Sequence, residues 1–507
     1  MSSPTAAFPD WLASRAASSP DRDALVTDGR TWSFRELDEQ VTRTAHHLVA
    51  LGARPGDRVA TLLHNGLAAV LLPHALLRLG ATLVPLNVRL GDSELAWQLA
   101  DAAPRLLVTE ERTVARAERA AESLSGRVTV CTDRALVGPA TPPPARDGDR
   151  ARLRLRHAAD AVLAMIYTSG TTGRPKGALL TVGNFWWSAI GSALNLGTHA
   201  DDRWLVCLPL FHVGGLSILT RAAIYGITAV VHDGFDPDAV SAAVDDERIT
   251  VVSVVATMLQ RMLDARGGRP WPASLRCVLL GGGPAPRPLL ERCASLGVPV
   301  VQTYGLTETC SQVATLAPGD ALLRSGSAGK VLYPNELRVA APPGTGASDD
   351  AGEILVRGPV VMAGYAGRPE DTARAIVDGW LHTGDIGRLD ADGYLYVLDR
   401  RDDLIVTGGE NVYPAEVEAV LLSHPSIAEV GVVGIGDETW GQRVVAVARL
   451  GDATAILDGA SLEALCRSRL AGYKVPREFR LVVEPLPRTA SGKLRRGALR
   501  DLLAGRS

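Results

Sequence analysis

The stretch YTSGTTGRPKG, residues 167–177, combines glycines, hydroxyl side chains and a lysine, the groups from which anion-binding loops are built. Glycines allow backbone N–H groups to turn toward an anion, while hydroxyls and an ammonium group add donors and positive charge. The spacing differs from the Walker loop G-x-x-x-x-G-K-[ST], because Gly170 and Gly173 stand too close together and Lys176 precedes a glycine. A mobile turn rich in Gly and Thr has the same composition, so composition alone leaves both interpretations open.

An apolar run, AVLAMIY at residues 161–167, leads directly into this loop and predicts a buried strand. Ligands of α/β proteins bind at the carboxyl ends of strands, so the position of the loop favours a phosphate site. The candidate contacts are Thr168, Ser169, Gly170, Thr171, Thr172, Gly173 and Lys176, of which Thr172 and Lys176 are the main ones.

The elements around the loop are expected to alternate between helices and strands. Residues 31–52 have the apolar spacing of a helix, with Thr31 and Ser33 as candidate N-caps. Residues 57–64 and 81–87 are short apolar segments that predict buried strands. Repeated alternation of this kind predicts an α/β fold with largely parallel sheets.

The chain of 507 residues is too long for one ordinary core, so two or more domains are expected. Residues 352–399 contain short strand patterns separated by turn signals, which predict a small β-rich lobe. A charged run, DRRDD at 399–403, marks the predicted boundary between a domain of residues 1–400 and a domain of residues 401–507.

Composition and charge narrow the class of protein. Hydrophobic residues make up 46% and charged residues 21%, a globular balance, and the net charge of -3 gives no sign of a nucleic-acid surface. The six cysteines are scattered without C-x-x-C spacing, which argues against a disulfide framework or a zinc site and favours the reducing cytoplasm. His74 and Arg78 interrupt the apolar residues 67–86, which therefore predict a buried helix and strand, not stable membrane insertion.

Several stretches, taken in order, resemble the motifs of the adenylate-forming superfamily of acyl-CoA synthetases, luciferases and nonribosomal adenylation domains. After the loop at 167–177 come LPLFHVGGLS (208–217), LLGGGPAP (279–286), QTYGLTET (302–309), GWLHTGDIG (379–387), DRRDDLIVTGGENVYPAEVE (399–418) and RTASGKL (488–494). The resemblance covers essentially the whole chain. It implies a large N-terminal adenylation domain with two stacked mixed sheets and a small β-rich lobe, followed by a small mobile C-terminal α+β domain.

The resemblance also implies a reaction in two halves that uses ATP, Mg²⁺ and coenzyme A. A carboxylate attacks the α-phosphate of ATP, which gives an acyl-adenylate and pyrophosphate, and the thiol of coenzyme A then displaces AMP. Lys493 resembles the catalytic lysine of the first half, although a solvated lysine is the alternative from sequence alone. Glu308 resembles the glutamate that binds magnesium, and Thr307 would touch the α-phosphate. The loop would hold the β- and γ-phosphates.

The remaining nucleotide contacts follow from the same motifs. The backbone of Gly282 and Gly283 would line the adenine, and Tyr304 would stack on it. Asp385 resembles the aspartate that accepts the ribose hydroxyls, and Arg400 resembles an arginine that assists at the nucleotide. Without the motifs, a core tyrosine, a turn aspartate and a surface arginine are the alternatives.

In this superfamily the small domain turns between the two half-reactions. Asp402 falls at the position of the hinge. The rotation would withdraw Lys493 and bring residues 408–414 to the active site, where Gly409 would line the pantetheine tunnel. A tight-turn glycine is the alternative for Gly409.

Residues 192–235 are similar to the o-succinylbenzoate–CoA ligases of menaquinone biosynthesis. That substrate has two carboxylates, so the one that is not activated needs a polar anchor in the pocket. Arg221 would act there through water, unless it lies on a surface helix, and Gly214 replaces a serine expected in the subfamily. His212 would border the acyl pocket and gate it, unless it is an ordinary core histidine. The candidate substrate contacts are His212, Arg221, Ser311 and Thr315.

Other functions remain open at this stage. A ligase for another aryl acid or a fatty acid fits the same motifs, and so does a module that loads a separate carrier protein. A binding protein without activity is disfavoured, because Lys493, Glu308 and Asp385 are all present. The expected partners are a small carboxylate, ATP and coenzyme A, without nucleic acid, and a homodimer stays open.

Overall fold

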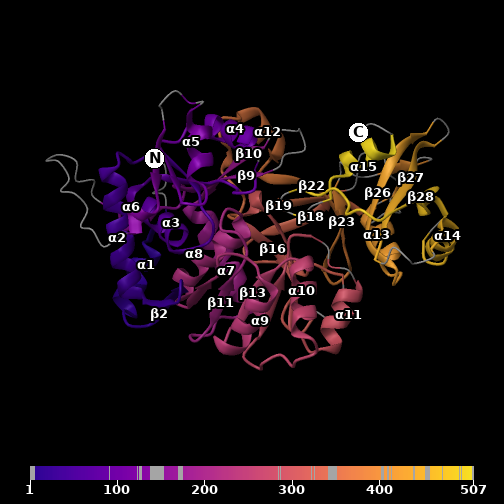
Figure 1. Ribbon diagram of the computed structural model, residues 1–507, viewed down its shortest axis with the longest axis horizontal. Helices are drawn as coiled ribbons and strands as arrows, with labels where there is room; N and C mark the ends of the chain where they lie inside the picture. The colour runs from indigo at the N-terminus through magenta and orange to yellow at the C-terminus, as the bar shows by residue number, and fades with distance from the viewer. Residues whose placement is uncertain are drawn as a thin grey trace.

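Figure 1 shows the computed structural model of the chain. The structure describes residues 6–90, 92–122, 124, 128–137, 153–168, 175–283, 285, 287–320, 323–324, 326–340, 351–400, 405–407, 410–412, 414–437, 440–451, 457–470, 472–489, 492 and 494–504, with the backbone alone at 93, 399, 400, 406, 410, 411 and 441.

One large sheet carries both ends of the glycine-rich loop. In the described residues its strands are ordered β20 (Gly364–Tyr365), β10 (Lys176–Thr181), β9 (Val162–Thr168), β5 (Thr82–Pro85), β4 (Arg58–Leu62), β6 (Leu106–Thr109) and β7 (Thr129–Thr132). The strands from β9 to β7 are parallel, whereas β10 is antiparallel to β9 and to β20. The strands expected at 57–64 and 81–87 are therefore confirmed as β4 and β5.

A second large sheet carries Tyr304, Ser311 and Thr315. Its described strands are ordered β17 (Lys330–Val331), β16 (Ser311–Thr315), β15 (Val300–Leu306), β14 (Cys277–Leu280), β13 (Val251–Val254), β11 (Arg203–Val206), β12 (Thr228–Val231), β2 (Asp23–Thr27) and β3 (Arg30–Ser33). A separate small ladder pairs β1 (Ala7–Pro9) with β8 (Arg156–Ala158).

Helices fill the space between the two sheets and cover their outer faces. The described helices of this part are α1 (Trp11–Ser18), α2 (Phe34–Ala50), α3 (Leu67–Leu79), α4 (Asp92–Ala102), α5 (Val114–Glu122), α6 (Arg134–Val137), α7 (Val182–Leu196), α8 (Val213–Tyr225), α9 (Pro237–Asp246), α10 (Ala256–Arg266), α11 (Arg287–Ser295) and α12 (Pro369–Ala375). One hydrophobic core joins side chains of α2, α3, α7 and α8 to side chains of both sheets. The stacked sheets expected from the resemblance are thus confirmed.

The helix predicted at 31–52 shows how local sequence sets these elements. Ser33 is its N-cap, and Ser33 and Glu36 bond to each other's backbone N–H groups in a capping box. Thr31 belongs instead to β3, so the alternative cap was wrong. The difference arises because Glu36 stands three residues after Ser33, where its carboxylate can reach back.

A β-rich lobe follows the second sheet, as predicted. It contains β18 (Glu336–Ala340), β19 (Ala351–Arg357), β21 (Ile376–Val377), β22 (Trp380–Leu389) and β23 (Leu395–Arg400). In Figure 1 these strands lie between the two large sheets and the last elements of the chain.

The last elements form an α+β unit around a core of their own. They are β24 (Ile405–Thr407), β25 (Glu410–Val412), α13 (Pro414–Leu422), β26 (Ile427–Asp437), β27 (Gly441–Leu450), α14 (Gly459–Arg467), β28 (Glu478–Val482) and α15 (Arg496–Leu503), which lie together at one end of the molecule in Figure 1. The apolar residues 67–86 form α3 and β5, and no helix among the described residues has the length and hydropathy needed to cross a membrane.

Candidate active site

The two ends of the glycine-rich loop are held side by side. Thr168 ends β9 and Lys176 begins β10, and the two residues are direct partners in the antiparallel ladder. Ladder pairing fixes the separation of these two residues. The structure therefore brings Thr168 and Lys176 together. The other predicted contacts of the loop, Ser169, Gly170, Thr171, Thr172 and Gly173, lie outside the described residues.

Lys176 is held by a carboxylate that the sequence did not single out. Its Nζ lies 3.0 Å from Oδ1 of Asp371 in α12 and 5.4 Å from the ring centroid of Tyr365. The side chains of Lys176 and Asp371 are 15% and 17% exposed, so solvent screens this pair only in part. Hydrogen bonds from Arg374 and Lys176 lower the pKa of Asp371. An ammonium group is thus fixed at the exit of the loop.

Glu308 follows β15 in a short 3-10 helix, Thr307–Thr309. Its backbone carbonyl accepts from the N–H of Met362 at 2.8 Å, and its Oε1 accepts from the hydroxyl of Tyr365 at 2.9 Å. Burial, and then the negative charge of Glu308, raise the pKa of Tyr365, so its hydroxyl keeps the proton that it donates. Glu308 is half-buried, which leaves its carboxylate accessible to a ligand.

The described residues contain no group of three or more His, Cys, Asp or Glu that could hold a metal ion. A site with a single carboxylate suits Mg²⁺, because this ion is usually held by one or two carboxylates together with substrate phosphates and water. Glu308, a hard oxygen donor close to the loop, fits that description.

Tyr304 and Asp385 form one polar pair. The hydroxyl of Tyr304 in β15 donates to Oδ2 of Asp385 in β22 at 2.8 Å, and the two residues are 9% and 5% exposed. Asp385 is also the register partner of Arg400 in β23, whose backbone alone is described. Three predicted nucleotide contacts therefore lie together, although they come from three different strands.

Two glycines of the run after β14 lie close to side chains of neighbouring segments. Gly282 has a φ of +79°, and a Cβ on it would lie 2.9 Å from Cγ1 of Val255. Gly281 is also confined, since a Cβ would lie 3.0 Å from Cγ2 of Thr303. Gly283 has open space around it. A flat group such as adenine could approach this surface, because no side chain stands out from it.

His212 lies at the N-terminal end of α8, on the expected acyl side. It is the N-cap residue of the helix, although its side chain does not make a capping bond, and it is half-buried. Its ring meets the ring of Phe211 edge to face, with centroids 4.7 Å apart. The neighbouring Gly214 has room for a side chain, since an added Cβ would meet only Cδ1 of Leu208 at 3.7 Å.

Arg221 is buried in the core, so the alternative of a surface helix was wrong. It is 1% exposed, and burial lowers its pKa. Its Nη2 donates to Oγ of Ser188 at 3.1 Å, and Oγ of Ser188 donates to the carbonyl of Cys310 at 2.7 Å. Among the described residues, Nε of Arg221 has no acceptor, and no carboxylate lies within ion-pair distance of the guanidinium. A buried guanidinium without a carboxylate partner can bind an anionic group.

The predicted substrate contacts are only partly brought together. Ser311 directly follows Cys310, and both have positive φ, +89° and +49°, which is strained backbone for residues other than glycine. Thr315 is buried at the other end of β16, roughly 13 Å along the strand at the usual rise per residue. Its hydroxyl bonds to Thr303 at 2.8 Å, inside the sheet. Ser311 thus adjoins the Arg221 network, whereas Thr315 does not.

Side chains that the sequence analysis missed surround the loop. Tyr167 donates to Oδ2 of Asp101 at 2.8 Å, and Arg368 donates to Oδ1 of the same residue at 2.6 Å. With Tyr365 and Asp371, these residues connect α4, β9 and the region before and within α12. These contacts join side chains that are far apart in the sequence, so no pattern in the local sequence predicts them.

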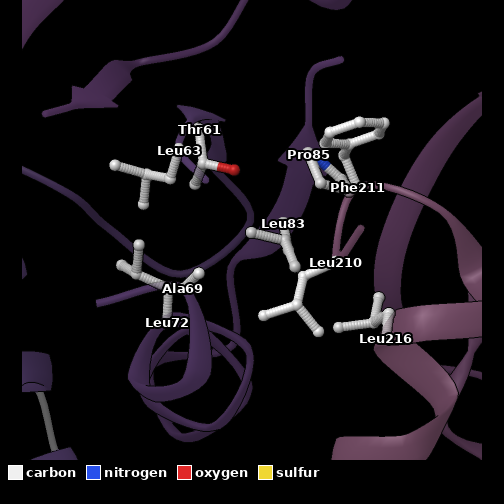
Figure 2. Close-up of a pocket in the computed structure, with 9 residues that line it drawn as sticks. All are labelled: Thr61, Leu63, Ala69, Leu72, Leu83, Pro85, Leu210, Phe211 and Leu216. Atoms are coloured by element: carbon white, nitrogen blue, oxygen red, sulfur yellow. The ribbon is translucent and has the colours of Figure 1, made fainter. Parts of the chain in front are cut away.

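A small apolar pocket lies between α3, β4, β5 and the chain just before α8 (Figure 2). Its lining residues are Thr61, Leu63, Ala69, Leu72, Leu83, Pro85, Leu210, Phe211 and Leu216. Thr61 alone among them has a polar side chain, so the pocket suits neither a nucleotide nor an acid with two carboxylates. Phe211, one of these lining residues, contacts the ring of His212 edge to face.

Three predicted residues of the C-terminal part, Asp402, Gly409 and Lys493, lie outside the described residues. The described chain around Lys493 is anchored by an ion pair, since Arg496 of α15 bonds Oε1 of Glu418 of α13 at 2.8 Å. The roles expected for Asp402, Gly409 and Lys493 stay predictions.

The geometry agrees with comparisons to known proteins. Residues 12–366 match the AMP-binding enzyme family, and residues 416–493 match the AMP-binding enzyme C-terminal domain. The chain is 50% identical over 498 residues to a 2-succinylbenzoate–CoA ligase of Geobacillus kaustophilus (strain HTA426), covering 98% of each chain. It also resembles o-succinylbenzoate CoA synthetase (MenE) from Bacillus subtilis in complex with the acyl-adenylate intermediate OSB-AMP, at 42% identity and a TM-score of 0.89 over 98% of this chain and 99% of that one. A structure of the same enzyme with ATP and a magnesium ion matches at 42% identity and a TM-score of 0.89, over 98% and 100% of the two chains.

Proposed function

This chain belongs to the AMP-binding enzyme family, and from that premise we propose that it is an ATP-dependent ligase of menaquinone biosynthesis. It converts 2-succinylbenzoate to its coenzyme A thioester through an acyl-adenylate. The observation that carries the choice of acid is Arg221, a buried guanidinium without a carboxylate partner among the described residues, linked through Ser188 to the backbone beside Glu308. The second carboxylate of such a substrate would pair with this guanidinium.

In the first half-reaction, one carboxylate oxygen of the acid forms a bond to the α-phosphorus of ATP. The bond to the bridging oxygen breaks, and pyrophosphate leaves. Positioning and neutralisation of charge supply most of the acceleration in such a step. Lys176 and the loop hold the β- and γ-phosphates, Thr307 touches the α-phosphate, and Lys493 draws the two reacting groups together.

Glu308 would hold Mg²⁺, which neutralises the phosphates when bound. Tyr304 and Asp385 contact the adenosine, and the backbone of Gly282 and Gly283 lines its adenine. The hydrogen bond between Tyr304 and Asp385 supports this, because it fixes the carboxylate before the ribose arrives.

In the second half-reaction, the thiolate of coenzyme A forms a bond to the acyl carbon, and AMP leaves with the electron pair of the broken C–O bond. We propose that residues 401–507 act as a domain that turns about Asp402 on the domain of residues 1–400. The turn withdraws Lys493 and brings Gly409 to the thiol path. The separate core of the C-terminal elements supports movement as one body.

In the acyl pocket, Arg221 and Ser311 bind the second carboxylate and His212 borders the reacting one. Their position supports this, since the Arg221 network ends at Cys310, two residues from Glu308. We place the enzyme in the cytoplasm, where ATP and coenzyme A are available, and a homodimer is compatible with this function.

The function is tested by the products that the purified protein forms with ATP, Mg²⁺ and coenzyme A, measured by liquid chromatography. 2-Succinylbenzoate is compared with benzoate, a cinnamate and medium-chain fatty acids. A strong preference for 2-succinylbenzoate supports the proposal. Turnover of the other acids alone would keep the adenylation mechanism, exclude the pathway, and point to Gly214 as the site of divergence. Transfer to an added carrier protein, without thioester formation on coenzyme A, would favour the carrier-loading alternative.

A further inference from the structure

The segment of residues 362–371 contacts the loop and the metal carboxylate at once. The N–H of Ala366 donates to the carbonyl of Gly177, the last residue of the stretch 167–177, at 2.8 Å. The N–H of Met362 donates to the carbonyl of Glu308 at 2.8 Å. One short segment therefore fixes the backbone on both sides of the phosphate region.

Tyr365 lies at the centre of this segment, between the two charged groups. Its hydroxyl donates to Oε1 of Glu308 at 2.9 Å, and its ring faces Nζ of Lys176 at 5.4 Å. Its own N–H donates to Oγ1 of Thr372 at 2.9 Å, and β20 pairs it with Ala178 of β10. The ring is thus held by strand pairing and by the start of α12.

A glutamate side chain has three rotatable bonds, so a half-buried carboxylate loses freedom when a metal ion binds it. A fixed hydroxyl on one oxygen removes part of that freedom before binding. Within the described part of the chain, Oε2 of Glu308 has no recorded hydrogen-bond partner and is available to a ligand.

We propose that Tyr365 is a positioning residue that orients Glu308 for the metal ion of Mg-ATP and couples that carboxylate to Lys176. The inference rests on the proposed function, because it assumes that Glu308 meets the metal. Asp371 completes the arrangement, since it holds Lys176 beside the ring of Tyr365.

The test is Tyr365→Phe, which keeps the ring and removes the hydroxyl. Binding of ATP is measured by isothermal titration calorimetry, once with excess Mg²⁺ and once with EDTA. A hydrogen bond to a charged group contributes enough to predict an approximately tenfold weaker Kd for Mg-ATP in the variant. The Kd for metal-free ATP is expected to change less than about twofold.

Tyr394→Phe is the matched control. The hydroxyl of Tyr394 donates to a carboxylate at 2.8 Å, as that of Tyr365 does, but its partner is Asp320. This variant is expected to bind both forms of ATP as the unmodified protein does. A double-mutant cycle adds Glu308→Ala, in which Tyr365→Phe should have an effect below about twofold, because the two residues act as a unit.

Equal weakening of both forms of ATP in Tyr365→Phe, an unchanged Kd for Mg-ATP, or additive effects in the cycle would overturn the inference. If the unmodified protein binds Mg-ATP no better than metal-free ATP, the failure lies in the proposed role of Glu308 as well. If it binds no ATP, the proposed function itself fails.

Discussion

At the scale of single residues, the most informative feature is Arg221, a buried cation without a carboxylate partner in the described part of the chain. Removing a guanidinium from water is costly, and the cost is usually offset by a carboxylate. Arg221 has a serine hydroxyl at 3.1 Å instead, and no carboxylate of the described residues lies within ion-pair distance of it. By contrast, Arg266, 3% exposed, pairs with Asp245 at 2.7 Å. A buried arginine without a carboxylate partner is expected at a ligand site. A buried arginine that pairs with a carboxylate is expected where it only stabilises the fold.

Arg221→Met is expected to raise KM for 2-succinylbenzoate at least about tenfold, because a charged hydrogen-bond partner is lost. The free energy of unfolding should not fall, since an unpaired buried charge is replaced by an apolar side chain. Steady-state kinetics and thermal unfolding measure the two effects. Arg266→Met is the control and should lower the melting temperature without changing the choice of acid. A large loss of stability with unchanged KM in Arg221→Met would contradict the assignment.

Two adjacent glycines of α8 should respond differently to the same change. Gly214→Ser fits, since its Cβ would have 3.7 Å to the nearest atom, and it restores the expected hydroxyl near His212. Gly215→Ser would place Cβ 2.4 Å from the carbonyl oxygen of Pro209, so a loss of about 1–3 kcal/mol in unfolding free energy is expected. Urea unfolding and the ratio of kcat/KM for 2-succinylbenzoate over benzoate measure the outcomes. Similar losses of stability would show that the room at Gly214 is not real.

At the scale of elements, a buried polar cluster joins α1, α2 and α3 to β8. Arg78 bonds Asp10 at 2.9 Å, and His157 lies 3.2 Å from the same carboxylate. Burial would raise the pKa of Asp10, but the hydrogen bonds from His157 and Arg78 hold it far below its usual value. The stability that this carboxylate contributes is therefore present above pH 4 and is lost only in strong acid.

His74 of α3 gives a different pH window. Burial lowers its pKa from 6.5 to about 4, the effect of Asp10 being opposite and smaller. Between these values the unfolded chain binds a proton that the folded protein does not, so the free energy of unfolding should fall by about 3 kcal/mol as the pH drops from 6.5 to 4.

Urea unfolding at pH 7.5, 6 and 5 measures this slope. His74→Gln should flatten the curve relative to the unmodified protein, while His46→Gln, at an exposed position of α2, should leave it unchanged. Parallel curves for all three proteins would exclude His74 as the titrating group.

At the scale of the whole molecule, the proposed mechanism uses two arrangements of the C-terminal elements, one for each half-reaction. Asp402→Pro is expected to restrict the hinge and uncouple the half-reactions, so that one falls much more than the other. Pyrophosphate release measures the first half, and thioester formation from supplied acyl-adenylate measures the second. Lys493→Ala is the reference and should lose the first half while keeping much of the second. Equal loss of both halves in Asp402→Pro would count against this hinge.

The sequence by itself determined the family, the α/β fold with its β-rich lobe and C-terminal unit, and the order of the motifs. These features follow from local patterns, because a glycine-rich loop, a capping box and an apolar strand can each be recognised from a few neighbouring residues. The pairing of Thr168 with Lys176 and the meeting of Tyr304 with Asp385 agree with the motifs. The catalytic roles of these residues remain predictions.

Only the tertiary structure decided which side chains hold those motifs in place. Tyr365 and Glu308 are separated by 57 residues, and Lys176 and Asp371 by 195. The burial of Arg221 likewise depends on distant segments, since its guanidinium contacts Ser188 of α7 and faces the Trp204 ring of β11. Sequence spacing predicts the face of an element, but a contact between elements is set by how the sheets stack and how the helices pack between them.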